Sequence, residues 1–487
     1  MKTSRRNYVI LAAGFIGLAL LIWYGMRPRA DLVEEYKAKM RAQGEKISFA
    51  ELGFPRPPEN ADGLVRLTNA VKRLPSASFD PGSLDFMHFT APGRALVSYR
   101  QTEPLWVEQS RSAAAQNNWD ELKSAFAAAT DPLAEIRLAV EQPIRWFRHD
   151  PTNSFRNPTA QPRYPFAPMR NAAQWLAADA IVALHANDRA RALSNVHALV
   201  QLTEFHREDP ELVALMIRVA ITGLGLAVTW EALQNPELTA SELALMQADW
   251  EKVDLMKGLE VGCLGARAMT DNFYAEKVER GTLQAKHTYF PDPDPSFRER
   301  IEGTFAAFLW QFGGEEDVVL AFQHLQTSLE NIRALRQQKP WVEVDAELQN
   351  LAREIEAAST GIRKYRHPIS GLLLPNYARA FRTVVRHDTQ RRLTITAIAL
   401  KRYHLQHRGF PAELNELVPA FLTAVPNDLM SGQSLRYRRN PDGTFTLYSV
   451  GEDGKDDGGD PTPPSPAKIF DLWSGRDAVW PMPDIPP

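Results

Sequence analysis

The stretch "NAAQWLAADAIVALHANDRARALSNVHALVQLTEFHRE", residues 171–208, decides the fold class of this chain. Its apolar residues recur every three or four positions, which is the period of amphipathic helices. Leu193, Val196 and Val200 lie on one face of the second helical segment, and the break between the two segments falls at 187–188. The stretch therefore predicts two amphipathic helices that pack as a hairpin.

Helical patterns continue through most of the chain. Asp209 and Pro210 predict the start of a third helix, because aspartate caps a helix N-terminus and proline fits the first turn. Thr239 and Glu242 have the spacing of a capping box for a fourth. Further helices are predicted at about 241–279, 296–312, 315–338, 342–358 and 376–407. No alternation with a period of two is evident before residue 430, so the predicted fold class is mainly α, a helical bundle or short solenoid.

The helical pair weakly resembles a tetratricopeptide-type hairpin, with Trp175 early in its first helix. A repeat protein of that type carries further copies at a period of about 34 residues. No second copy is found, so the resemblance does not imply a repeat array.

The bulk composition bounds the class of protein. The 487 residues are 44% hydrophobic and 24% charged, which is typical of a globular chain long enough for two or three domains. The formal net charge is −3, so no basic field attracts the chain to nucleic acid, and we exclude a nucleic-acid partner. Cys263 is the single cysteine, which excludes an intrachain disulfide and a multi-cysteine zinc site.

The N-terminus predicts a membrane anchor. Residues 8–26, "YVILAAGFIGLALLIWYGM", contain no charged residue, and at about 1.5 Å per helical residue they nearly match the roughly 30 Å hydrocarbon core of a bilayer. Basic residues precede the segment and no small-x-small cleavage site follows it, which is typical of an uncleaved signal anchor. We predict a cytoplasmic tail at 1–7, a single-pass transmembrane helix at 8–26, and the bulk of the chain on the periplasmic side of a bacterial inner membrane. The alternative is a buried core helix.

A second apolar run covers residues 212–233. Arg218 and Glu231 interrupt it, and an arginine near mid-bilayer costs about 2.5–3.5 kcal/mol even on the lenient insertion scale. We therefore predict a core helix there, within an α-helical, envelope-facing domain at residues 27–385.

The pattern changes after the last long helix. Residues 434–438 and 444–450 alternate apolar and polar side chains, and the turn sequence "NPDG" lies between them at 440–443. These features predict a small antiparallel hairpin. Residues 463–487 follow as a proline-rich C-terminal tail.

Residues 386–462 resemble the C-terminal half of the major pseudopilins of type II secretion. The matching pieces arrive in the family order: "GFP" at 409–411, "PND" at 426–428, "LRYR" at 435–438 and "LYSVGEDG" at 447–454. The resemblance implies an α+β module in which a long helix is followed by a small sheet and a calcium loop. The N-terminus lacks the processing site of that family and a large helical body precedes the module, so we do not expect the chain to polymerise. As a whole, it looks like uncharacterised membrane-anchored bacterial proteins.

The resemblance also places a calcium site in the acidic loop "GEDGKDDGGD" at 451–460. It implies Asp453 as one carboxylate ligand and a further carboxylate from Asp456, Asp457 or Asp460. Two more ligands are the backbone carbonyls of Val450 and Lys455. The composition agrees, because five carboxylates against one lysine leave a local net charge of −4 and Ca²⁺ takes about six to eight oxygen ligands. Calcium would be structural there, with a Kd on the order of 10⁻⁴ to 10⁻³ M. The alternative is a solvated acidic turn.

The long loop at residues 142–168 mixes arginines with aromatic side chains. Loops of this length are often functional, and arginines beside aromatic faces can hold an anionic or glycan-like ligand. The ligand-binding candidates are Arg145, Trp146, Arg148, Arg156, Arg163 and Tyr164. The alternative is a proline-stiffened strap whose aromatic rings are buried.

No known catalytic motif accompanies these features. The chain has no G-x-S-x-G elbow, no phosphate loop of the G-x-x-x-x-G-K type and no H-E-x-x-H. His404 and His407 lie three residues apart, but this spacing fixes no third metal ligand. We therefore predict an interaction or scaffolding protein of the cell envelope, with an envelope protein as its partner, rather than an enzyme. The alternative is an envelope hydrolase that uses the 142–168 loop as its substrate cleft.

Overall fold

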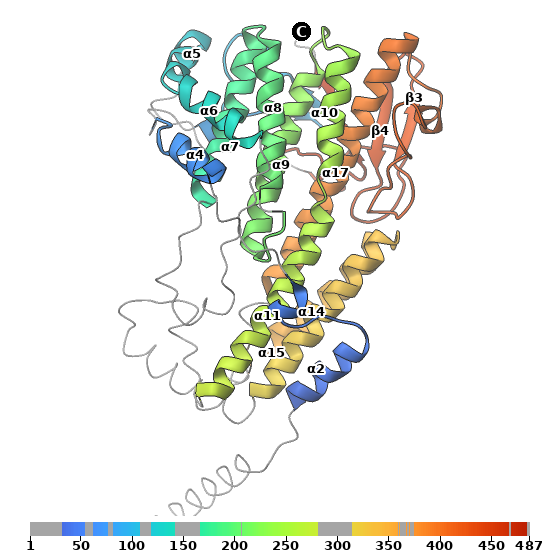
Figure 1. Cartoon of the computed structure of the whole chain (residues 1–487). Coiled ribbons are helices and arrows are strands. Elements are labelled where there is room, and N and C mark those ends of the chain that lie inside the picture. Colours follow the sequence, from blue (N-terminus) through green and yellow to red (C-terminus); the bar gives the residue numbers. More distant parts are fainter. Residues whose placement is uncertain are drawn as a thin grey trace, which may run out of the picture.

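The computed structural model describes residues 32–53, 62–75, 81–107, 118–141, 166–205, 207–280, 314–358, 360, 367, 370, 375–466 and 469–484. The predicted cytoplasmic tail, the anchor and the helix expected at 296–312 lie outside these residues. The described part is mainly helical and contains two small sheets, so the mainly α class is confirmed (Figure 1).

Three helices form the centre of the fold and pack along one another (Figure 1): α7 (Phe166–His185), α8 (Arg189–Glu204) and α9 (Leu212–Leu233). The helical pair predicted from the sequence is thus confirmed. Between α7 and α8, Asn187 has a left-handed φ of 57°. The Asp188 side chain then accepts a hydrogen bond from the backbone N–H of Arg191, which caps the start of α8.

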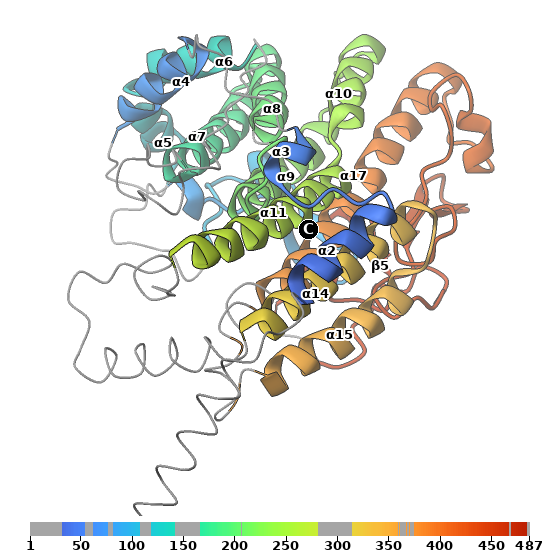
Figure 2. The ribbon, with the colours of Figure 1, turned by 60° about the horizontal axis from the view of Figure 1, so that its bottom comes forward.

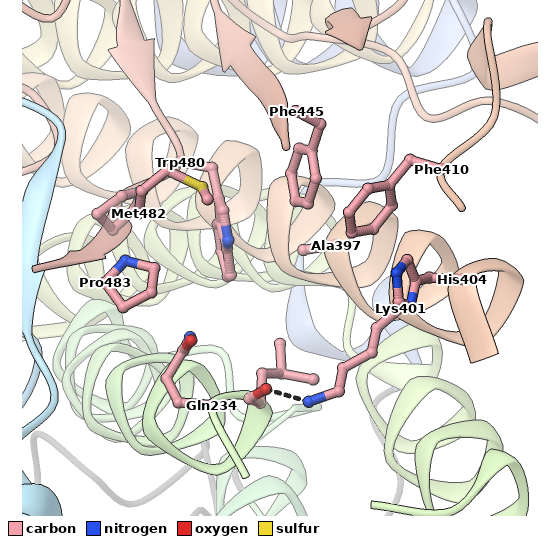
Figure 3. A pocket seen from close by; sticks show the side chains of 11 residues that line it. Gln234, Ala397, Lys401, His404, Phe410, Phe445, Trp480, Met482 and Pro483 are labelled. Atoms are coloured by element: carbon pink, nitrogen blue, oxygen red, sulfur yellow. Dashed lines mark hydrogen bonds between the residues drawn. The ribbon is translucent and has the colours of Figure 1, made fainter. Parts of the chain in front are cut away.

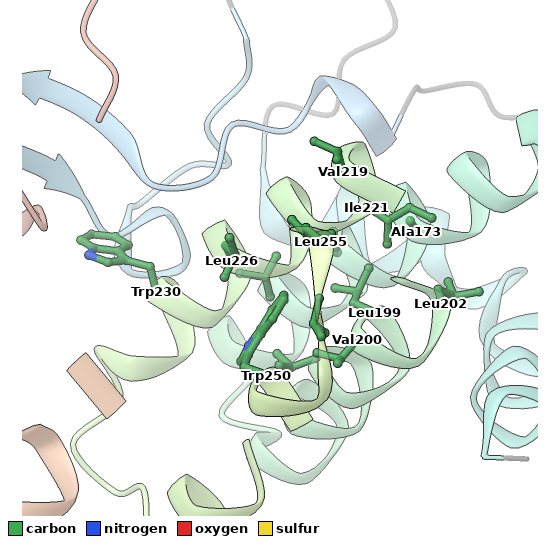
Figure 4. Close-up of a cluster of buried hydrophobic side chains, with 14 of the residues drawn as sticks. Ala173, Leu199, Val200, Leu202, Val219, Ile221, Leu226, Trp230, Trp250 and Leu255 are labelled. Carbon is green, nitrogen blue, oxygen red and sulfur yellow. The ribbon is translucent and has the colours of Figure 1, made fainter. Parts of the chain in front are cut away.

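Further helices complete the main core: α10 (Ala240–Lys252), α11 (Leu255–Arg280) and α17 (Pro375–His407). In Figure 4, Trp250 of α10 lies beside Leu199 and Leu226 from α8 and α9. The indole Nε1 of Trp250 donates a hydrogen bond to Thr229 Oγ1 at 3.0 Å. A Cβ atom on Gly225 would lie 3.0 Å from the Trp250 ring, so this glycine lets the indole pack directly on the backbone of α9.

Shorter helices from the first third of the chain cover α7 and α8: α4 (Asp62–Lys72), α5 (Trp119–Ala127) and α6 (Thr130–Val140). The Asn118 side chain caps α5 by accepting a hydrogen bond from the backbone N–H of Glu121. Phe126 of α5 meets Trp175 of α7 edge-on, with 5.0 Å between the ring centroids. These contacts join helices from the first third of the chain to the main core.

A second, smaller core lies where α11 meets α2 (Leu32–Ala42), α3 (Phe49–Leu52) and α14 (Gly314–Arg336). A further helix, α15 (Trp341–Ala358), packs on α14 and α17 and belongs to the main core. Figure 2 shows α2 alongside α14, and the two helices contact each other. Their shared interior includes Val33, Met40, Ile47, Phe273 and Phe322.

Strands occur before residue 430, so the expectation of an entirely helical body is wrong there. β1 (His88–Ala91) and β2 (Arg94–Leu96) form an antiparallel hairpin, and Gly93 in its turn has a φ of 68°. β2 also pairs in parallel with β6 (Met482–Asp484) near the C-terminus. Strands of three or four residues are too short for an alternating pattern to be recognised in a sequence.

After α17 the chain forms a 3-stranded sheet in the order β3–β4–β5. The bounds are β3 (Arg436–Arg439), β4 (Phe445–Ser449) and β5 (Ala478–Val479). The predicted hairpin is confirmed, because β3 and β4 pair antiparallel across the turn at 440–443. Residues after 462 were expected only as a proline-rich tail, but they supply β5 and β6 and thereby contact both sheets. Short 3-10 helices lie at Pro81–Ser83, Ser98–Arg100 and Leu414–Leu417.

Among the described helices, α9 is long and apolar enough to cross a membrane, and 56% of its most apolar window is buried within the protein. It packs against α7, α8, α11 and α17. Both charged residues that interrupt it are buried and hydrogen-bonded: Arg218 Nε donates to the carbonyl of Thr203, and Glu231 accepts from the backbone N–H of Ser98. Both side chains are therefore held inside the protein by hydrogen bonds to the backbone.

Candidate functional site

A pocket of about 240 Å³ lies where the C-terminal end of α9 meets α17, β4 and the segment from Trp480 to β6 (Figure 3). Most of its lining is apolar: Leu233, Ala397, Phe410, Phe445, Trp480, Pro481, Met482 and Pro483. The polar lining residues are Gln234, Lys401 and His404. The pocket therefore joins four segments that are far apart in the sequence.

The sheet β3–β4–β5 positions the aromatic wall of the pocket. Phe445 is the first residue of β4, and its ring meets that of Phe410 edge-on, with 4.8 Å between centroids. Trp480 directly follows β5, and its backbone N–H donates to a carbonyl of β4 at 2.8 Å. The indole Nε1 of Trp230 on α9 donates to the carbonyl of Pro481 at 2.9 Å. The aromatic wall is thus bonded both to the sheet and to the central helix.

Lys401 brings a cation to the pocket. Its Nζ donates hydrogen bonds to the carbonyl oxygens of Leu233 and Asn235, the latter at 2.8 Å. These carbonyls lie at the C-terminal end of α9, where a helix carries partial negative charge. Burial and, to a smaller extent, the charge of Arg100 together lower the pKa of Lys401 to about 8. No carboxylate in the described part of the chain forms an ion pair with Lys401.

The geometry of α17 gives the pocket its polar side. Ala397, Lys401 and His404 lie at helical spacing on one face of this helix. His404 is exposed at the mouth, where its ring lies 4.7 Å from that of Phe410. Arg100 donates a hydrogen bond to the carbonyl of Gln234, so a second cation lies at the end of α9. Positive charge therefore gathers at one end of an otherwise apolar cavity.

Glu231 holds the N-terminal hairpin against this end of α9. Its Oε1 accepts hydrogen bonds from the backbone N–H groups of Met87 and Ser98 at 3.0 and 2.9 Å. Burial raises the pKa of Glu231 to about 7, although these hydrogen bonds oppose the shift. Because the hairpin strand β2 pairs with β6, Glu231 supports the strand that lines the pocket.

Three carboxylates of the acidic loop predicted to bind calcium pair with arginines from elsewhere in the protein. Its carboxylates pair with arginines outside the loop: Glu452 with Arg386 at 2.6 Å, Asp456 with Arg436 at 3.0 Å and Asp460 with Arg476 at 3.6 Å. Asp453 instead accepts a hydrogen bond from the backbone N–H of Lys455. Each of the three ion pairs thus joins a different loop carboxylate to a different arginine.

The backbone around the acidic loop is held by two buried carboxylates. Asp477 accepts hydrogen bonds from the backbone N–H groups of Asp457 and Gly459, and Asp428 accepts from that of Val450. Within the described residues, no group of three or more His, Cys, Asp or Glu side chains converges on a possible metal position.

The arginine–aromatic loop is described only from residue 166, where α7 begins. Its ligand-binding candidates all lie outside the described residues: Arg145, Trp146, Arg148, Arg156, Arg163 and Tyr164.

Sequence reasoning missed the pocket. Two signals pointed to it: a lysine inside the apolar run "ITAIALK" at 395–401, and the apolar stretch "VWPMP" at 479–483 within the segment taken as a tail. Neither signal identifies its partner segments. No family model matches the chain, and no curated protein or solved structure is significantly similar to it.

Proposed function

We propose that this chain is a binding protein of the cell envelope, held at the membrane by residues 8–26, that recognises its partner or ligand through the pocket between α9 and α17. One observation carries the proposal, namely an apolar pocket with aromatic walls and a half-buried lysine at one end. Ligand sites are typically mostly apolar cavities with a few placed polar groups.

The size of the pocket suits a small apolar group. Its volume of about 240 Å³ is below the roughly 300–1,000 Å³ of pockets for drug-sized ligands. It matches one or two amino-acid side chains or a single substituted ring. Phe410, Phe445 and Trp480 would contact such a ring through their faces and edges.

The pseudopilin-like reading of residues 386–462 remains part of this proposal. It is supported by the order of elements, since a long helix, α17, is followed by the β3–β4 hairpin and the acidic loop. In this reading, the C-terminal module presents Lys401, Phe410 and Phe445 to the pocket, and the helical body presents the end of α9.

Binding of a neutral aromatic probe tests the proposed function. The full chain in lipid nanodiscs should bind 3-phenylpropionamide, detected by saturation-transfer NMR with empty nanodiscs subtracted. Ala397→Phe fills the pocket from α17 and should abolish the signal, and Phe445→Ala should weaken it. Leu245→Phe is the matched control, because Leu245 is 70% exposed on α10, and it should bind as the parent does. Equal signals from Ala397→Phe and the parent would place the probe outside the pocket and contradict the proposal.

Calcium binding by the acidic loop also remains a proposal, and it rests on carboxylate density. Occupancy would require Asp456 and Asp460 to exchange Arg436 and Arg476 for the ion, which favours the weak affinity of extracellular sites, on the order of 10⁻⁴ to 10⁻³ M. At about 100 times Kd, calcium would raise the free energy of unfolding by roughly 2.7 kcal/mol in the parent. Asp453→Ala should remove this gain. Identical thermal unfolding in EGTA and in calcium would contradict calcium binding by the loop.

A further inference from the structure

Resting on the proposed binding function, we infer that the ligand of this pocket is an aromatic or aliphatic monocarboxylate. Its carboxylate binds Lys401, and its apolar body lies between Phe445 and Trp480.

Lys401 has no carboxylate partner within the described residues, which points to an anionic group on the ligand. Lys401 has hydrogen bonds only to the carbonyls of Leu233 and Asn235, and no carboxylate in the described residues pairs with it. The nearest carboxylate in sequence to the pocket wall, that of Asp484, accepts a hydrogen bond from Thr90 instead. Lys401 is half-buried and partly desolvated, which is costly for a cation without an ionic partner, so a ligand carboxylate would relieve this cost.

Arg100 adds a second positive charge near Lys401. Its guanidinium bonds the carbonyl of Gln234 at the end of α9 and contributes to the lowered pKa of Lys401. His404 at the mouth offers a further hydrogen-bond donor on the same face of α17. These groups favour an anion at one end of the pocket.

The apolar wall of the pocket restricts which groups the ligand can carry besides its carboxylate. Phe445, Trp480, Met482 and Pro483 offer apolar contacts, and the volume of about 240 Å³ accommodates one ring or a short chain. A second charge on the ligand would face this apolar wall without a partner, so the site selects a single carboxylate joined to an apolar body.

The test compares two probes that differ only in charge, 3-phenylpropionate and 3-phenylpropionamide, by isothermal titration of the full chain in nanodiscs at pH 7. In the parent, the carboxylate should bind at least about tenfold more tightly than the amide. Lys401→Met should bring the two affinities together, while Lys401→Arg should retain the preference. The preference should also decline above pH 8, where Lys401 loses its proton.

The outcomes separate this inference from the proposed function. Equal binding of both probes to the parent, with loss in Ala397→Phe, would overturn the carboxylate inference and leave the pocket as a neutral site. A carboxylate preference that persists in Lys401→Met would assign the charge effect to another group and also overturn it. Absence of binding by either probe would contradict both the inference and the proposed function.

Discussion

Replacement of Glu231 by alanine should lower the free energy of unfolding by about 3–5 kcal/mol at pH 5. The change leaves the backbone N–H groups of Met87 and Ser98 without their acceptor, and each buried donor left unsatisfied costs about 1–3 kcal/mol. The loss of the side chain also leaves a cavity at a fully buried position. Urea unfolding followed by circular dichroism measures the change.

The effect of Glu231 should depend on pH. Its pKa rises from 4.5 to about 7 in the folded protein, so the folded state holds the proton more tightly than the unfolded state. The stabilisation from this difference is complete below pH 4.5 and is lost as the pH rises through 7, a change of about 3 kcal/mol. The difference in the free energy of unfolding between the parent and Glu231→Ala should therefore be smaller at pH 8 than at pH 5.

Glu237→Ala provides the matched control for this prediction. Glu237 lies six residues after Glu231, and its exposed side chain pairs with Arg189 at 3.4 Å. Exposed pairs contribute about 0–1 kcal/mol, so the control should unfold close to the parent at both pH values. A Glu231→Ala protein as stable as the parent at pH 5 would show that the hairpin does not depend on this carboxylate.

Replacement of Glu45 by alanine should cost about 3–5 kcal/mol, because it breaks a buried ion pair from one side. Glu45 pairs with the fully buried Arg267 at 3.1 Å and with Arg333. Gln326 on α14 donates to the same carboxylate at 3.1 Å. The variant leaves Arg267 without its carboxylate partner, and it loosens the loop after α2 from α11 and α14.

Lowering the pH should lower the free energy of unfolding of the parent through protonation of Glu45. The Glu45→Ala variant lacks this contribution. Burial alone would raise the pKa of Glu45, but hydrogen bonds from Arg333, Gln326 and Arg267 outweigh it and hold the pKa at about 2, against 4.5 when unfolded. The stabilisation is therefore complete above pH 4.5 and is lost as the pH falls towards 2, by about 3 kcal/mol.

The control for Glu45 is Glu347→Ala, which breaks the exposed pair with Lys339. It should change the free energy of unfolding by less than about 1 kcal/mol. If Glu45→Ala destabilised the chain no more than this control does, the ion pair would contribute nothing beyond a surface contact.

The acidic loop illustrates how far sequence reasoning reached. Its charge density is evident from the sequence, and a metal ion is one physical means of relieving it. The structure relieves it with arginines from α17, β3 and the segment before β5. None of these arginines lies within the loop, and Arg386 is 66 residues from its partner Glu452, so the local net charge of −4 overstated the charge that the folded loop carries.

By itself, the sequence determines the features that depend on neighbouring residues. The α7–α8 pair follows from helical periodicity. The capping box follows from the spacing of Thr239 and Glu242, and the β3–β4 turn follows from its turn residues. The tertiary structure alone decides the pocket and the pairing of β2 with β6. Arg94 pairs with Met482, and Lys401 bonds the end of α9. Segments hundreds of residues apart meet there only because burial of the shared core brings them together, and no local pattern encodes which segments meet.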